Sequence, residues 1–310
     1  MKAKPINTSI LIKQQVDHRG YLLSFNYLNA KQVSGRSQGA DVLVPLTVLN
    51  QSDSYGECWM DGTAIKTSSM ALGYQIQSRQ HLVLIFEVDE TEVAPMVYKV
   101  YQSAYQISQQ LGYTHLLRTW NYLADINALD GDIERYQAFC VARHESMQNN
   151  QQLSSPNPAA TAIGSHNGQN CFVFLFGLQA GVVIENKRQV SAWEYPLQYA
   201  PKQPRFSRAL VLDGVLMCSG TASVVGHETI HFNNLSKQFD ECLLNIAELI
   251  KESGLDKEIT AGIYRFYLRD SQYLPVLNDK ISGFGIEHYV ILLGDVCREN
   301  LLVECEVVFQ

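Results

Sequence analysis

One order of elements occurs twice along this chain, and it constrains the fold more than any other feature. Hydrophobic periodicity predicts a helix, a strand, a helix and two strands between residues 96 and 186. The same order is predicted between residues 236 and 309, where the second helix is a short helix or a loop. At the same step of each copy stands a similar hexapeptide, WNYLAD at 120–125 and RFYLRD at 265–270. The match predicts two copies of one α+β module.

Local signals set the expected bounds of these elements. Predicted helices cover 96–111 with a stop at Gly112, 133–148 with a cap within Asp130–Asp132, and 236–253 from Ser236 to Gly254. Predicted strands cover 9–13, 21–28, 42–50, 81–90, 115–125, 171–178, 181–186, 259–270, 288–295 and 301–309, and 209–220 is a strand or a hairpin. Residues 50–80 and 190–208 are expected to be irregular. We therefore expect an N-terminal module with additional strands over 1–190 and a C-terminal module over 191–310.

Composition excludes several classes of protein. The formal net charge of -7 without a basic stripe argues against a nucleic-acid binder, although a few local arginines could still hold a small anion. The seven cysteines are scattered without metal-ligand spacing, so reduced thiols are expected, with neither disulfides nor zinc. The N-terminus lacks the apolar stretch of a secretory signal, and no run reaches the length of a membrane helix. A cytoplasmic protein is expected.

Arginines occur at positions where a plain core would carry aliphatic residues. In the predicted helix 133–148, Arg143 shares one face with Tyr136 and Phe139. Its guanidinium could extend to water along its packed stem, or it could be buried to bind an anion. Strand alternation places Arg265, Tyr267 and Arg269 on one face. That face could be the exposed side of an edge strand, or an anion site made of guanidinium groups.

Two acids and one cysteine near the C-terminus are candidates for chemistry. Alternation places Glu304 and Glu306 on one face of the last strand. Such a pair is often solvated, but burial in a pocket would raise the pKa of Glu304 and make it a proton donor near neutral pH. Cys297 lies seven residues earlier, in GDVCREN. No histidine is spaced to activate it, so packing is the simpler interpretation.

The segment HETIH at 227–231 matches the HExxH pattern of zinc proteases. Its surroundings, SGTASVVGHETIHFNN, are rich in Gly, Ser and Asn and predict turns. A zinc protease holds this motif on a long helix. We therefore expect no metal site here.

Several segments together resemble the chorismatase family, whose members cleave chorismate. The matching segments are WNYLADIN (120–127), GDIERYQAFCVARH (131–144), PAATAIG (158–164), SAWEYPLQYAPKQPRFSRA (191–209), SGTASVVGHE (219–228) and GDVCRENLLVECE (294–306). They occur in the family's order, and the first 90 residues contribute little. The resemblance implies an α+β fold of two RidA/YjgF-like, chorismate-mutase-like modules, with mixed sheets and helices on one face. This agrees with the duplication derived above.

The resemblance also implies site residues. Glu304 stands at the position of the family's proton-donating glutamate, and Cys297 at the position of a cysteine found in members that make 3-hydroxybenzoate. Arginines and tyrosines of the family hold the substrate's carboxylates, a role that the resemblance gives here to Arg143, Tyr199, Arg205 and Arg269. Gly220, Thr221 and Tyr267 complete the expected substrate-binding set. No metal or organic cofactor is implied, and the partner is chorismate itself, bound by a monomer or a small homo-oligomer.

The product is less determined than the substrate. Cys297 favours a hydroxybenzoate, either the 3-isomer or the 4-isomer, whereas Gly220 is more similar to members that form a dihydrodiol. The sequence ARHESM at 142–147 departs from the family's small-residue pattern there, although Arg143 is retained. A catalytically silent small-molecule binder and an imine hydrolase of the RidA type remain as alternatives from other classes.

Overall fold

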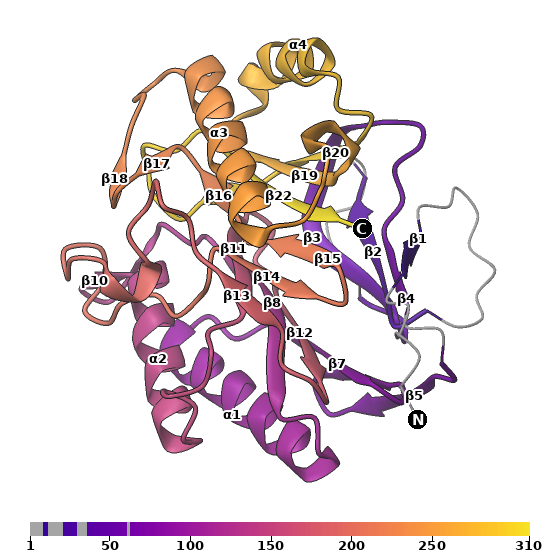
Figure 1. Cartoon of the computed structure of the whole chain (residues 1–310). Coiled ribbons are helices and arrows are strands. Elements are labelled where there is room, and N and C mark those ends of the chain that lie inside the picture. Colours follow the sequence, from indigo (N-terminus) through magenta and orange to yellow (C-terminus); the bar gives the residue numbers. More distant parts are fainter. Residues whose placement is uncertain (1–8, 12–20, 30–35, 61–62) are drawn as a thin grey trace.

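The computed structural model describes residues 9–11, 21–29, 36–60 and 63–310. Two mixed β-sheets face each other, and helices cover the outer face of each sheet (Figure 1). The apolar core between the sheets contains Trp120 and Tyr122 from one sheet and Tyr267 and Val290 from the other. Each sheet also has an apolar core of its own on the other face, where its helices pack against it. The fold is therefore α+β, as expected, with helices on one face of each sheet.

The first sheet has the order β21-β11-β8-β12-β7-β6-β5. Its strands are β5 (Lys66–Met70), β6 (Gly73–Gln77), β7 (His81–Val88), β8 (His115–Ala124), β11 (Ala159–Ser165), β12 (Asn170–Gly177) and β21 (Asp295–Val296). Helices α1 (Val93–Leu111) and α2 (Arg135–Asn149) pack on its outer face, and the short strands β9 (Leu129–Asp130) and β10 (Ile133–Glu134) precede α2. Strand β8 is thus central, with a parallel and an antiparallel neighbour.

The second sheet has the order β1-β4-β2-β3-β20-β19-β22-β15-β14-β13, and β16 pairs with β22 beside this path. Its strands are β1 (Ser9–Leu11), β2 (Leu23–Leu28), β3 (Asp41–Gln51), β4 (Cys58–Met60), β13 (Val182–Ile184), β14 (Ala209–Leu212), β15 (Val215–Cys218), β16 (Thr221–Ala222), β19 (Ile263–Leu268), β20 (His288–Leu293) and β22 (Val303–Phe309). Helices α3 (Leu235–Ser253) and α4 (Leu274–Phe284) cover it. Among the described helices, none is both long and apolar enough to cross a membrane.

The same module is present in both sheets. The order β11-β8-β12-β7-β6-β5 corresponds to β20-β19-β22-β15-β14-β13, with a parallel first pair and antiparallel pairs in the rest. WNYLAD and RFYLRD lie on the corresponding strands β8 and β19, and the hydroxyl groups of their tyrosines, Tyr122 and Tyr267, are 3.5 Å apart. The division at residue 190 stays a prediction, and strand pairing crosses it, because β3 pairs with β20 and β21 pairs with β11.

Some local expectations were wrong. Residues 50–80 contain strands β4, β5 and β6. The hydrophobic pattern did not predict them, because β4 has only three residues, β5 has no buried residue and β6 has only one. The small-residue run at 158–164 forms β11, so the last two strands of the first copy are β11 and β12, whereas 182–184 forms β13 at one edge of the second sheet. Residues 12–13 of the first predicted strand lie outside the described residues.

The helix stops were predicted correctly and the caps were not. Gly112 and Gly254 end α1 and α3 in the left-handed conformation. Asn234, not Ser236, caps α3 by accepting a hydrogen bond from the Lys237 amide at 3.0 Å. Asp130 does not cap α2, and its carboxylate accepts instead from the amide of Val93 at the start of α1, at 3.0 Å. The cap therefore joins two elements distant in sequence, which periodicity cannot reveal.

A charged cluster lies between the two sheets. Arg265 is 1% exposed on the central strand β19, so the exposed edge-strand interpretation was wrong. Its Nε donates to Glu57 at 2.8 Å and its Nη1 to Glu306 at 2.8 Å. Its guanidinium also lies 3.7 Å from the centre of the Phe25 ring. The anions that Arg265 binds are therefore the protein's own carboxylates.

Candidate active site

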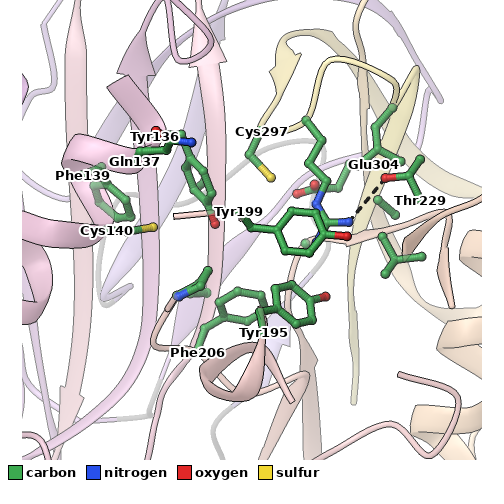
Figure 2. A pocket seen from close by; sticks show the side chains of 18 of the residues that line it. Tyr136, Gln137, Phe139, Cys140, Tyr195, Tyr199, Phe206, Thr229, Cys297 and Glu304 are labelled. Carbon is green, nitrogen blue, oxygen red and sulfur yellow. Dashed lines mark hydrogen bonds between the residues drawn. The ribbon is translucent and has the colours of Figure 1, made fainter. Parts of the chain in front are cut away.

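A cavity of about 600 Å³ opens beside the edge of the facing sheets. Its walls come from α2, the small residues of β11, the irregular segment 195–208, the segment 220–232 and the segment 297–304 (Figure 2). In Figure 2, Phe139 and Cys140 lie on one side, and Cys297 and Glu304 lie on the other. The small side chains Ala160 and Ala162 of β11 leave room between these walls, which explains the run of small residues.

The cavity brings together residues that are far apart in sequence. Six of the predicted site residues line it, namely Arg143, Tyr199, Arg205, Gly220, Cys297 and Glu304. They come from helix α2, the irregular connection 190–208, the turn before β16, the loop after β21 and the last strand β22. The site therefore exists only once both modules have packed together.

Three predicted site residues, Thr221, Tyr267 and Arg269, do not line the cavity. The Thr221 hydroxyl donates to the Ser219 carbonyl at 2.8 Å, and the Tyr267 hydroxyl donates to Glu306 at 2.9 Å. Arg269 forms an ion pair with Asp295 and donates to the carbonyls of Leu301, Val296 and Arg298 at 2.7 Å each. Since its donors are occupied, Arg269 shapes the loop that carries Cys297 rather than offering itself to a ligand.

Glu304 is the group best suited to donate a proton. Its carboxyl group belongs to β22, lines the cavity and is only 5% exposed. Burial, and next the neighbouring charge of Glu306, raise the pKa of Glu304 to about 8, against the opposing pull of three arginines. At neutral pH the carboxyl is therefore mostly protonated, as a general acid requires.

Gly220 leaves the space that this carboxyl occupies. A Cβ atom built on Gly220 would stand 2.0 Å from Glu304 Oε1 and 2.9 Å from its Cδ. Any larger residue would force the carboxyl to move. Gly220 thus faces the candidate acid directly, which gives a physical reason for a glycine at this position.

Arg143 and Arg205 form a cationic part of the cavity wall. Arg143 is 3% exposed, so its guanidinium does not extend to water, and it lies over the Tyr101 ring at 5.2 Å. Among the residues that the structure describes, its Nε and Nη2 have no hydrogen-bond partner, nor does Nε of Arg205. Burial, and then the nearby charge of Arg143, lower the pKa of Arg205. Adjacent cations with unused buried donors favour an anionic ligand.

Two further arginines in the cavity were not predicted. Arg208 Nη2 donates to Tyr195 Oη at 2.5 Å and to the Val190 carbonyl at 2.8 Å. Arg298 lies 4.0 Å from the Tyr199 ring centre. Both lower the pKa of Glu304, so both are close enough to act on it electrostatically. The sequence offered one signal for each: Arg208 lies inside the aromatic-rich segment 191–209, and Arg298 directly follows Cys297.

Cys297 is not placed as a nucleophile. Burial, and next the charge of Glu304, raise the pKa of its thiol to about 12, so the thiolate is scarce at neutral pH. It lines the cavity as a small, weakly polar group.

The HETIH residues lie on the hairpin β17 (Val224–Val225)–β18 (Glu228–Thr229) and the following turn rather than on a helix. His227 Nδ1 is 3.1 Å from the Tyr199 hydroxyl. His227 therefore adjoins an aromatic wall of the cavity.

Comparison with known proteins gives consistent similarities. A family model described as "Chorismatase FkbO/Hyg5-like, N-terminal" matches residues 57–176. A "3-hydroxybenzoate synthase" from Streptomyces hygroscopicus is 37% identical over 226 residues, which are 66% of this chain and 66% of that protein. A "Chorismatase" from Streptomyces rapamycinicus is 34% identical over 228 residues, 67% of each chain. The aligned region thus spans about two thirds of each relative.

A solved crystal structure of a chorismatase superposes on nearly the whole chain. The TM-score is 0.85 at 24% sequence identity, and the superposition covers 98% of this chain and 99% of the other. At this identity the likeness shows the fold. The two facing sheets and their four α-helices are therefore an arrangement shared with that protein.

Proposed function

The chain belongs to the chorismatase family, and from this premise we propose that it converts chorismate into pyruvate and a hydroxybenzoate. The observation that carries the proposal is a buried carboxyl group, Glu304, which lines a cavity together with four arginines and whose pKa is raised by burial to about 8. Chorismate carries two carboxylates and an enol ether whose methylene carbon accepts a proton. The relative named 3-hydroxybenzoate synthase supports the 3-isomer as the product.

The proposed chemistry starts at the enol ether. Glu304 transfers its proton to the methylene carbon, which forms a C–H bond and leaves a positive charge shared by the adjacent carbon and the ether oxygen. The resulting Glu304 carboxylate faces that charge in a site of low dielectric constant and stabilises it. Water or the ring hydroxyl then attacks the cationic carbon, and the bond from that carbon to the ether oxygen breaks. In both routes the C–O bond at the other oxygenated ring carbon also breaks, and the carbon that keeps the ether oxygen loses its hydrogen as a proton, which makes the ring aromatic. With water as the nucleophile the ring hydroxyl leaves as water, whereas with the ring hydroxyl as the nucleophile its oxygen leaves in the pyruvate. Hydroxybenzoic and pyruvic acids together contain the atoms of chorismic acid, so no net water is consumed.

The arginines supply the anchoring. Arg143 and Arg205 line the cavity and offer unused buried donors, and their planar guanidinium groups suit a carboxylate. Arg208 and Arg298 lie nearer the acid, and their side chains are held by Tyr195 and against Tyr199. We assign one substrate carboxylate to each pair. The substrate is then oriented between two cationic regions with its reacting carbon toward Glu304.

Removing the cation at Arg143 should weaken substrate binding. The Arg143→Met variant is expected to raise KM for chorismate about 100-fold with a smaller change in kcat, because a charged hydrogen-bonding partner is lost without touching the acid. Steady-state pyruvate assays measure both constants. Lys251→Met, at an exposed position on α3, is the matched control for loss of a cation. An unchanged KM in Arg143→Met would remove Arg143 from the binding site.

Adding a methyl group at Gly220 should disturb the acid. Gly220→Ala is expected to lower kcat about tenfold, because the new Cβ displaces the Glu304 carboxyl from its present position. Gly283→Ala on α4 is the control, since a Cβ there meets no atom within 4 Å. Both variants should keep the circular dichroism spectrum of the parent. A Gly220→Ala enzyme of full activity would show that the carboxyl does not need this position.

The direct test uses the purified chain and chorismate. Pyruvate should appear together with an aromatic product that co-elutes with 3-hydroxybenzoate on chromatography. A product that co-elutes with 4-hydroxybenzoate or a dihydrodiol would overturn the assignment of the isomer or of the product class. Absence of pyruvate above background would overturn the proposed reaction. The oligomeric state stays at the prediction of a monomer or small homo-oligomer.

A further inference from the structure

Glu306 lies two residues beyond Glu304 on β22 and is only 2% exposed. Its Oε1 accepts hydrogen bonds from Trp120 Nε1 and Arg265 Nη1, both at 2.8 Å. Its Oε2 accepts from Thr161 Oγ1 at 2.6 Å and from Tyr267 Oη at 2.9 Å. Each carboxylate oxygen thus has two donors from strands of the facing sheets.

Glu306 is held as an anion. Burial by itself would raise its pKa, but Arg265, Arg118 and the hydrogen bonds from Thr161 and Trp120 outweigh burial and lower the pKa below its ordinary value. Arg118 Nη2 lies 3.2 Å from Oε2, and both side chains are almost fully buried. A buried carboxylate with two guanidinium partners and three neutral donors keeps its charge across the neutral pH range.

Glu306 does not itself reach the cavity. Thr161 stands between them, since it lines the cavity while its hydroxyl accepts from Arg118 Nη2 at 2.7 Å and donates to Glu306. A substrate in the cavity therefore meets Glu304 and the wall of Thr161, but not the second carboxylate. Any influence of Glu306 on a reaction must act through Glu304.

We propose that Glu306 is a positioning residue whose fixed negative charge keeps the neighbouring Glu304 carboxyl protonated at neutral pH. The inference rests on the proposed role of Glu304 as proton donor. After burial, the charge of Glu306 is the largest influence that raises the pKa of Glu304. Arg118, Arg208 and Arg298 lower this pKa. Other titratable groups that face Glu304 or share its cavity are Cys297, Cys305, Cys140, Tyr136, Tyr195, Tyr199, Tyr267, Arg143, Arg205, Glu134, Glu228 and Glu299.

The charges around Glu304 allow a test with two opposite signs. Glu306→Gln removes the anion and leaves the arginines, so the titration midpoint of Glu304 should fall by about one pH unit or more. Arg118→Met removes an opposing cation, so the midpoint should rise. Infrared difference spectra of the ligand-free protein measure the midpoint from the carboxyl band that is absent in Glu304→Gln. A structural role for the cluster would predict no such pair of opposite shifts.

Thermal unfolding and circular dichroism first establish which variants are folded. If Glu306→Gln does not fold, the double variant Glu306→Gln with Arg118→Met removes the paired cation as well, and its midpoint should lie below that of Arg118→Met alone. A midpoint that is unchanged in the folded variants overturns the proposal. Opposite shifts support it, even if the wild-type protein releases no pyruvate, an outcome that would refute the proposed reaction alone.

The pH dependence of kcat supplies the functional readout. The rate should fall as pH rises through the Glu304 midpoint. This alkaline limb of the profile should therefore shift to lower pH in Glu306→Gln and to higher pH in Arg118→Met. A uniform loss at every pH, with the limb unmoved, would mean that Glu306 only supports the fold and would overturn the positioning role.

Discussion

Pyruvate release should fall about 10²- to 10⁴-fold when Glu304 is replaced with glutamine, because the substitution removes the proton that the enol ether must receive. Glutamine keeps the size of the side chain, so the cavity and its arginines should stay in place. The measurement is kcat at pH 7 with saturating chorismate, detected as pyruvate. Wild-type activity itself should decline as pH rises through about 8, the pKa to which burial and Glu306 raise the Glu304 carboxyl.

The same variant should gain stability, which separates a chemical defect from an unfolded protein. The pKa of Glu304 in the folded chain, about 8, lies above its ordinary value of 4.5. The stabilisation from the neutral carboxyl is therefore complete below about pH 4.5 and is lost as pH rises toward 8. Glutamine has no charge to bury at any pH. Its advantage in unfolding free energy should grow over this window to on the order of a few kcal/mol at pH 8.

Urea denaturation of both proteins at pH 5 and pH 8 measures this gain. Glu228→Gln is the control, since Glu228 also lines the cavity but is exposed, and its loss should change rate and stability far less. A Glu304→Gln enzyme that keeps the wild-type rate would exclude Glu304 as the acid. Equal pH dependence of stability in the two proteins would mean that the carboxyl is not buried in its neutral form.

Arg265→Met should destabilise the fold by about 3–5 kcal/mol, the expected cost of leaving a buried ion unpaired. Arg265 is the shared partner of Glu57 and Glu306, and all three side chains are at most 3% exposed. Methionine fills part of the space against Phe25 but offers no donor to either carboxylate. Chemical denaturation at pH 7 gives the change in unfolding free energy.

A double variant identifies the cause of that loss. Glu57→Gln with Arg265→Met removes one of the two stranded charges, so it should recover part of the stability lost in the single variant. Lys187→Met, which breaks the exposed pair with Glu252, should have no measurable effect. A change of less than about 1 kcal/mol in Arg265→Met would show that the cluster is not needed for stability.

Strand periodicity identified which side chains share a face, but not what that face meets. It correctly paired Arg265 with Tyr267 and Glu304 with Glu306, and the facing sheet then buried all four. It failed for Arg269 because β19 ends at Leu268, after which alternation no longer applies. Arg208 and Arg298 were overlooked since neither lies on a helix or strand whose pattern could mark it.

The sequence by itself determined the α+β class, the duplication and the helix stops, and it predicted Glu304 as the acid, because these depend on local periodicity or on short motifs. Only the tertiary structure decided which strands share a sheet and which arginines have unused donors. It also showed that Glu306 is bound by Arg265 while Glu304 faces the cavity. These properties depend on contacts between residues far apart in the sequence, such as Trp120 and Glu306, which form a hydrogen bond of 2.8 Å across a sequence separation of 186. The surroundings thus shift the pKa values of two carboxyl groups on one strand in opposite directions, up for Glu304 and down for Glu306, which no pattern within the strand encodes.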